Sequence, residues 1–120
     1  MLLNQIKCTR KSNGKSQFTS GKSFKVTLSY NDKSINFIFH DNYLNESKKE
    51  DFIYSLLADA QAYEYNPTFE SFCYEFGYSS DSIKALKIYK CCKKQYAKLY
   101  NLFTTIEVNQ LWQELEKSGY

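Results

Sequence analysis

Histidine and cysteine, which often serve as catalytic groups and metal ligands, are scarce in this chain: there is one histidine and there are four cysteines. His40 stands beside Asp41, but a lone histidine catalyses only with a positioned nucleophile and a third, orienting group. Cys91 and Cys92 are adjacent rather than spaced as C-x₂-C, and a single histidine offers no second ligand pair for zinc. We therefore expect no enzymatic activity, no metal site and no cofactor.

The lysines carry more information, because residues 82–103 hold six of them and no acidic residue. At about 100° per residue, five of these lysines share one face of a helix, and a mainly apolar set shares the other. Such a row of ammonium groups can follow phosphates or dock in an acidic protein groove. The alternative is a solvated face, although no Glu stands at i±4 to pair with these charges. The candidate binding residues are Lys84, Lys87, Lys90, Lys94 and Lys98, and the apolar set is Ala85, Ile88, Tyr89, Cys92, Tyr96, Leu99 and Phe103.

The remaining charge is also arranged in blocks. Residues 1–33 hold seven Lys or Arg and one acid, whereas residues 34–81 hold nine acids and two lysines. The acidic block either imitates a phosphate backbone or is ordinary solvent-facing charge near helix starts. Eleven tyrosines exceed what a core of this size can bury with every hydroxyl satisfied, so some must reach the surface. The candidates are Tyr43, Tyr54, Tyr65, Tyr74, Tyr78 and Tyr120.

The first third of the chain predicts strands. Residues 24–30 and 35–40 alternate apolar and polar side chains, the period-2 pattern of half-buried strands, around a four-residue turn at 31–34. These runs predict a β-hairpin, and we expect a third strand at residues 3–10 followed by a loop at 11–22. Because an isolated hairpin is marginal in water, a third strand or a helix must cover its apolar face.

Capping signals divide the rest of the chain into four predicted helices. The first helix follows a capping box at Ser47 and Glu50 and runs to about residue 64, and the second spans 69–76 between Thr68 and Gly77. The third helix begins at residue 80 or 81 and runs to about 103. The fourth begins with a capping box at 104–107 and ends near 119. Strands before helices predict an α+β fold. We expect one domain over 1–120: an N-terminal antiparallel β-hairpin or three-stranded sheet (1–41) packed against four C-terminal α-helices (47–118).

Neither a membrane span nor a secretory leader is expected. The chain has no run of about 18 apolar residues, and its first residues lack the apolar core of a signal peptide. The predicted location is therefore the cytoplasm, with the cysteines reduced.

One stretch resembles small phage and prophage proteins that carry the run FEDFCxEFGYDxDSRKAxKIY. The departures are Ser79, where Asp is usual, and Ile83, where Arg is usual. The resemblance covers roughly residues 24–103 and implies a mobile-element origin. The residues that carry it are 69–78, 81–85 and 87–89.

Small phage proteins without catalytic groups usually act by occupying a host machine, so this origin implies a function. The leading hypothesis is a non-enzymatic inhibitor of a host defence complex, of the anti-CRISPR type. It would bind a Cas effector in the cytoplasm of the bacterial host and block nucleic-acid access or activation. One alternative is a direct nucleic-acid-binding module that uses the lysine-lined helix. Another is a structural or assembly component of a phage, and the oligomeric state stays open.

Overall fold

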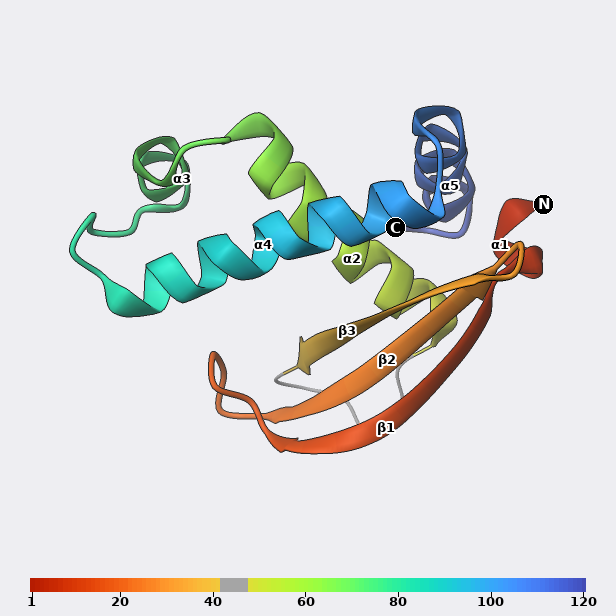
Figure 1. Ribbon diagram of the computed structural model, residues 1–120, viewed down its shortest axis with the longest axis horizontal. Helices are drawn as coiled ribbons and strands as arrows, with labels where there is room; N and C mark the ends of the chain where they lie inside the picture. The colour runs from red at the N-terminus through yellow and green to blue at the C-terminus, as the bar shows by residue number, and fades with distance from the viewer. Residues whose placement is uncertain (42–47) are drawn as a thin grey trace.

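The structure is a computed structural model that describes residues 1–41 and 48–120. It confirms the predicted α+β class: an N-terminal three-stranded antiparallel sheet is followed by four main helices packed together (Figure 1). A short N-terminal helix, α1, precedes the sheet and was not predicted. The elements are α1 (Leu2–Gln5), β1 (Lys7–Lys15), β2 (Lys22–Tyr30), β3 (Lys33–Asp41), α2 (Lys49–Tyr65), α3 (Phe69–Phe76), α4 (Ile83–Leu102) and α5 (Thr105–Lys117).

The sheet has the order β1-β2-β3, so β2 is central and β3 is an edge strand. The predicted hairpin is β2–β3, but its turn has two residues rather than four. Asn31 and Asp32 take positive φ angles of 50° and 62°, as a type I′ turn requires. Lys33 and Ser34 therefore belong to β3, where they pair with Tyr30 and Ser29.

The prediction for residues 3–22 was partly wrong. Leu2, Leu3 and Ile6 are buried at helical spacing, and the Glu114 carboxylate accepts the main-chain N–H groups of Leu2 and Leu3 at 3.2 Å each. The first strand then extends through the polar residues 11–15, which were assigned to a loop. Pairing with β2 explains the difference, because ladder hydrogen bonds hold an exposed strand whatever the polarity of its side chains.

The helix boundaries follow local capping. As predicted, Thr68 caps α3 by accepting the Ser71 N–H, and Gly77 ends it in the left-handed region at φ 72°. The reciprocal capping box of Thr104 and Glu107 opens α5, also as predicted.

Two helix starts differ from the prediction or lie beyond the described residues. Ser82 caps α4, one or two residues later than expected, because its hydroxyl accepts the Ala85 N–H at 3.0 Å. The predicted Ser47 cap of α2 lies outside the described residues, and α2 begins after Lys48, whose N–H donates to the Asp51 carboxylate at 2.8 Å.

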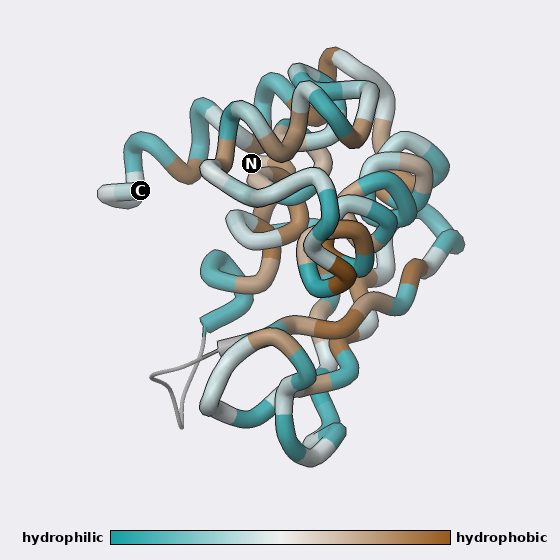
Figure 2. Tube along the Cα trace, turned by 90° about the vertical axis from the view of Figure 1, so that its left-hand side faces the viewer, coloured by the Kyte–Doolittle hydropathy of each residue, from teal (hydrophilic) through white to brown (hydrophobic). Residues whose placement is uncertain are grey.

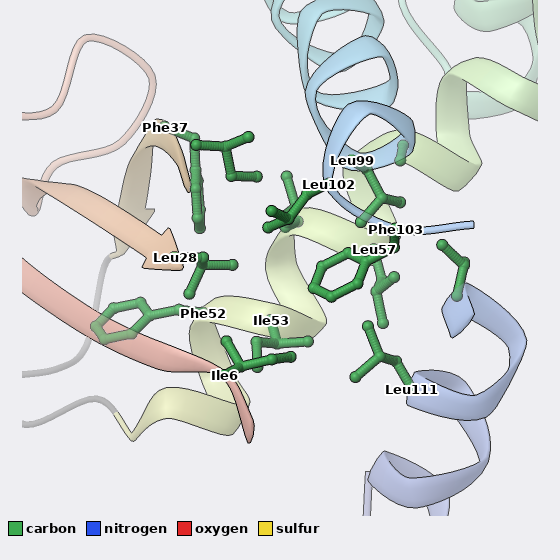
Figure 3. Packing of buried hydrophobic residues seen from close by; sticks show 14 of the residues in the cluster. Ile6, Leu28, Phe37, Phe52, Ile53, Leu57, Leu99, Leu102, Phe103 and Leu111 are labelled. Atoms are coloured by element: carbon green, nitrogen blue, oxygen red, sulfur yellow. The ribbon is translucent and has the colours of Figure 1, made fainter. Parts of the chain in front are cut away.

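The core lies where the inner face of the sheet meets α2, α4 and α5 (Figure 3). In Figure 2 hydrophilic segments dominate the outer turns of the helices, and hydrophobic segments gather toward the middle of the molecule. The buried residues shared by these elements include Leu28, Phe37, Phe52, Ile53, Leu57, Leu99, Leu102, Phe103 and Leu111. No helix within 1–41 and 48–120 is both long and apolar enough to cross a membrane.

Several tyrosines reach the surface, as predicted. Tyr74 is the most exposed of them, at 90%, while the predicted Tyr43 lies outside the described residues. The other predicted tyrosines that are exposed are Tyr54, Tyr65, Tyr78 and Tyr120.

Candidate anion-binding groove

Helix α4 is anchored by the apolar face that its periodicity predicted. Ala85, Cys92 and Leu99 are buried on it, and Ile88, Tyr89 and Tyr96 are half-buried around them. Gln95 and Leu102 are buried as well, which the sequence did not indicate. The buried arc is wider than predicted because α4 packs on several elements: α2, strand β3 and, at its N-terminal end, α3.

The predicted lysine face of α4 lies beside β3, an edge strand of the sheet. Four of its five lysines line a groove of about 460 Å³ between α4 and β3 (helix and strand in Figure 1). We call this the lysine groove and define it by Lys87, Lys90, Lys94 and Lys98 of α4 facing Ile38 and His40 of β3. Lys84 is exposed and does not line it.

Lys98 is held in place at one end of the lysine groove. Its Nζ donates to the main-chain oxygen of Asn36 at 2.6 Å, and its side chain is half-buried. Lys87, Lys90 and Lys94 are exposed, and no carboxylate of the described residues forms an ion pair with them. The groove therefore carries positive charge that the described part of the chain does not neutralise.

The loop between β1 and β2 bounds the opposite end of the groove through Gln17 and Phe18. The Ser16 hydroxyl oxygen accepts the N–H groups of Phe18 and Thr19 at 3.0 and 3.1 Å, and it lies 2.7 Å from His40 Nδ1. Both lone pairs of that oxygen are thus used, so the hydroxyl donates its proton to Nδ1 and the ring proton of neutral His40 sits on Nε2. Burial lowers the pKa of His40, which favours this neutral form.

This arrangement fastens the loop and differs from an activated nucleophile. In a serine nucleophile, as here, the histidine accepts the hydroxyl proton, but there a third group also orients the ring through its other nitrogen. Here the oxygen of Ser16 is already bonded to two main-chain N–H groups, and no side-chain bond of the described residues orients His40 through Nε2. The Phe18 and His40 rings make an edge-to-face contact, with 4.7 Å between ring centroids, and complete the end wall.

A smaller cavity of about 140 Å³ adjoins the groove and holds Asp59, Cys91 and Cys92. Burial raises the pKa of Asp59 to about 6. Burial, with the nearby Asp59 carboxylate, also raises the pKa of Cys91 and brings that of Cys92 to about 12. These thiols are therefore protonated at neutral pH and are poor nucleophiles.

Replacing Asp59 by Asn should stabilise the protein at pH 8 by about 2 kcal/mol and change little at pH 4. The pKa of Asp59 in the folded protein lies above its value near 4 in the unfolded chain. The contribution of Asp59 to the free energy of unfolding is therefore complete below about pH 4 and is lost as the pH rises through about 6. Urea unfolding of both proteins at the two pH values measures this difference. Asp81→Asn, at an exposed position, is the control, and equal stability gains for Asp59→Asn at pH 4 and pH 8 would contradict the assignment.

A second group of lysines lies on the outer face of the sheet. Cys8 pairs with the buried Leu28, so the alternate residues Lys7 and Lys11 face away from the core, and Lys11 pairs with Lys25. Among the described residues, Lys11 and Lys25 line no groove, whereas Lys7 and Lys33 line a hollow of about 460 Å³ that also holds the acidic side chain of Asp32. In the lysine groove, by contrast, four lysines gather without an acidic residue in the described lining. The lysine groove is therefore the better candidate for specific binding.

Sequence analysis missed the groove residues that lie outside α4. Gln17, Phe18 and Ile38 come from a loop and a strand that are distant from α4 in sequence, and no local pattern links them to it. Comparison of the chain with known protein families, with curated proteins and with solved structures finds no match.

Proposed function

We propose that this protein acts by binding, and that the lysine groove receives a negatively charged segment of its partner. The observation that carries the proposal is the row of Lys87, Lys90 and Lys94, whose ammonium groups share one groove without a carboxylate of the described residues to pair with them. Like charges four residues apart on a helix repel one another. An anionic partner would relieve this repulsion and gain charge-assisted hydrogen bonds.

Binding without catalysis agrees with the chemistry around the groove. The hydroxyl of Ser16 fastens a loop, and the raised pKa of Cys91 and Cys92 keeps these thiols protonated. None of these groups is poised for attack on a substrate.

The resemblance of residues 69–89 to phage proteins directs the proposal toward a host defence complex. In this account the protein is a non-enzymatic inhibitor of the anti-CRISPR type. It binds a Cas effector and blocks nucleic-acid access or activation. The exposed rings of Tyr74 and Phe76 on α3 offer additional contact area, since aromatic side chains are favoured at protein interfaces.

Direct nucleic-acid binding is the second candidate, and the regular lysine row favours it as well. Lys90, Lys94 and Lys98 recur every four residues, which places their Cα atoms about 6 Å apart along α4. Such a row could follow successive phosphates. Binding of this kind weakens by roughly one log unit of affinity per log unit of salt for each phosphate contacted.

Capture from the lysate of a host with an active CRISPR system separates these candidates. The tagged protein is incubated with lysate, with and without nuclease treatment, and the retained proteins are identified by mass spectrometry. We expect a Cas effector to be retained in both samples. Retention that disappears with nuclease would favour the nucleic-acid module, and absence of any Cas protein from both samples would contradict the inhibitor proposal.

A further inference from the structure

The two-residue turn between β2 and β3 fixes which main-chain groups of the edge strand face the lysine groove. In such a turn the Tyr30 carbonyl accepts the Lys33 N–H, so Tyr30 and Lys33 form a hydrogen-bonded pair. Hydrogen-bonded pairs alternate with non-bonded pairs along an antiparallel ladder. On β3 the odd-numbered residues therefore bond to β2, and the even-numbered residues point their N–H and C=O groups outward.

These outward groups lie at the lysine groove and are almost unused. Ile38 and His40 line the groove, and no main-chain hydrogen bond to either residue is formed on this side by the described residues. One hydrogen bond does reach these outward groups: Lys98 Nζ donates to the Asn36 carbonyl. The outward main-chain groups of β3 therefore face α4. The groove thus combines an open strand edge with a row of ammonium groups.

We propose that the lysine groove binds a short, extended, acidic segment of a partner protein, which pairs with β3 as a fourth strand. This inference rests on the proposed function and specifies the partner's chemistry. Strand addition to a sheet edge uses main-chain hydrogen bonds for affinity and side chains for selectivity. Here the selecting groups are Lys87, Lys90 and Lys94, whose charge matches carboxylates on the added strand.

The spacing of carboxylates on an added strand agrees with the spacing of the lysines on α4. Alternate side chains of an extended strand project from the same face about 6.8 Å apart. Lysines four residues apart on α4 repeat about every 6 Å along the helix axis. A segment with an acid at every second position therefore presents successive carboxylates at nearly the spacing of Lys90 and Lys94.

Other occupants fit the groove less well. A nucleic acid has no main chain of alternating donors and acceptors to match Ile38 and His40. A second copy of the chain paired through β3 would bring two lysine rows together, which like-charge repulsion opposes.

Binding of a defined peptide tests the inference. The probe is a seven-residue peptide of alternating valine and glutamate with blocked ends, and its control is the same peptide with methylated main-chain nitrogens. Calorimetry should show that the unmethylated peptide binds the protein, and that the methylated control binds at least about tenfold more weakly. NMR-detected hydrogen exchange should show the amides of Ile38 and His40 exchanging quickly in the free protein and slowly in the complex.

The possible failures identify which claim is wrong. If both peptides bind equally and the two amides stay unprotected, strand pairing is overturned while charge-based binding survives. If a thymidine oligonucleotide of equal charge binds through Lys87 and Lys94 and the peptide does not, the occupant of the lysine groove is a nucleic acid and the inference of an acidic protein segment is overturned. If neither probe binds at low salt, both this inference and the lysine groove as a binding site fail. A peptide-free dimer with protected Ile38 and His40 amides would overturn the inference in favour of self-pairing.

Discussion

Replacing Lys87 and Lys94 together by Glu should weaken binding of the anionic partner by at least about 100-fold. Each substitution removes a charge-assisted contact and introduces a charge that repels the ligand, so a loss of about 3 kcal/mol is the expected minimum. Both side chains are exposed, so the fold should be unaffected. The affinity is measured by calorimetry with the purified partner, or with the acidic peptide probe, at low salt.

The matched control keeps the same change in net charge on the same helix. Lys84 and Lys93 are exposed and do not line the lysine groove, so the Lys84→Glu/Lys93→Glu double variant should lose less than about threefold. Thermal unfolding of both double variants shows whether the fold is intact. If the control variant loses as much affinity as the groove variant, net charge explains binding and the groove has no special role.

Replacing Leu99 by Ala should lower the free energy of unfolding by about 3 kcal/mol, the second large effect that we expect. Leu99 is 1% exposed and packs among the side chains that join α4 to α2 and α5 (Figure 3). Removing three buried carbons leaves a cavity that a close-packed core fills only in part. Urea unfolding gives the change as a shift of the midpoint at constant slope.

The control for this prediction is an apolar truncation at the surface. Ile106 is 79% exposed, and Ile106→Ala should change the free energy of unfolding by less than about 0.5 kcal/mol. A Leu99→Ala protein as stable as Ile106→Ala would show that α4 is not anchored through this residue. The position of the lysine groove would then lose its structural basis.

Elements whose limits depend on local chemistry were predictable from the sequence. Thr68 and Gly77 delimit α3, and Thr104 with Glu107 opens α5, because each cap bonds to main-chain groups within a few residues. The β2–β3 hairpin was predictable for the same reason, since its alternation and turn residues are adjacent in sequence.

Features that depend on distant segments were not predictable. The limits of β1 come from pairing with β2, and α1 is held by Glu114, more than 100 positions away. Periodicity showed that Lys87, Lys90, Lys94 and Lys98 share a helix face, but it does not reveal what that face opposes. The strand edge of β3, the loop with Phe18 and the burial of Gln95 all arise from tertiary packing.

The most direct test of the central claim locates an anionic ligand on the protein. An ¹⁵N-labelled sample is titrated with the alternating valine–glutamate peptide at low salt, and amide chemical shifts are followed. The account predicts that the largest shifts occur at Lys87, Lys90, Lys94, Ile38 and His40. Shifts centred on Lys7, Lys11 and Lys25 of the outer sheet face, with the groove amides unmoved, would contradict it.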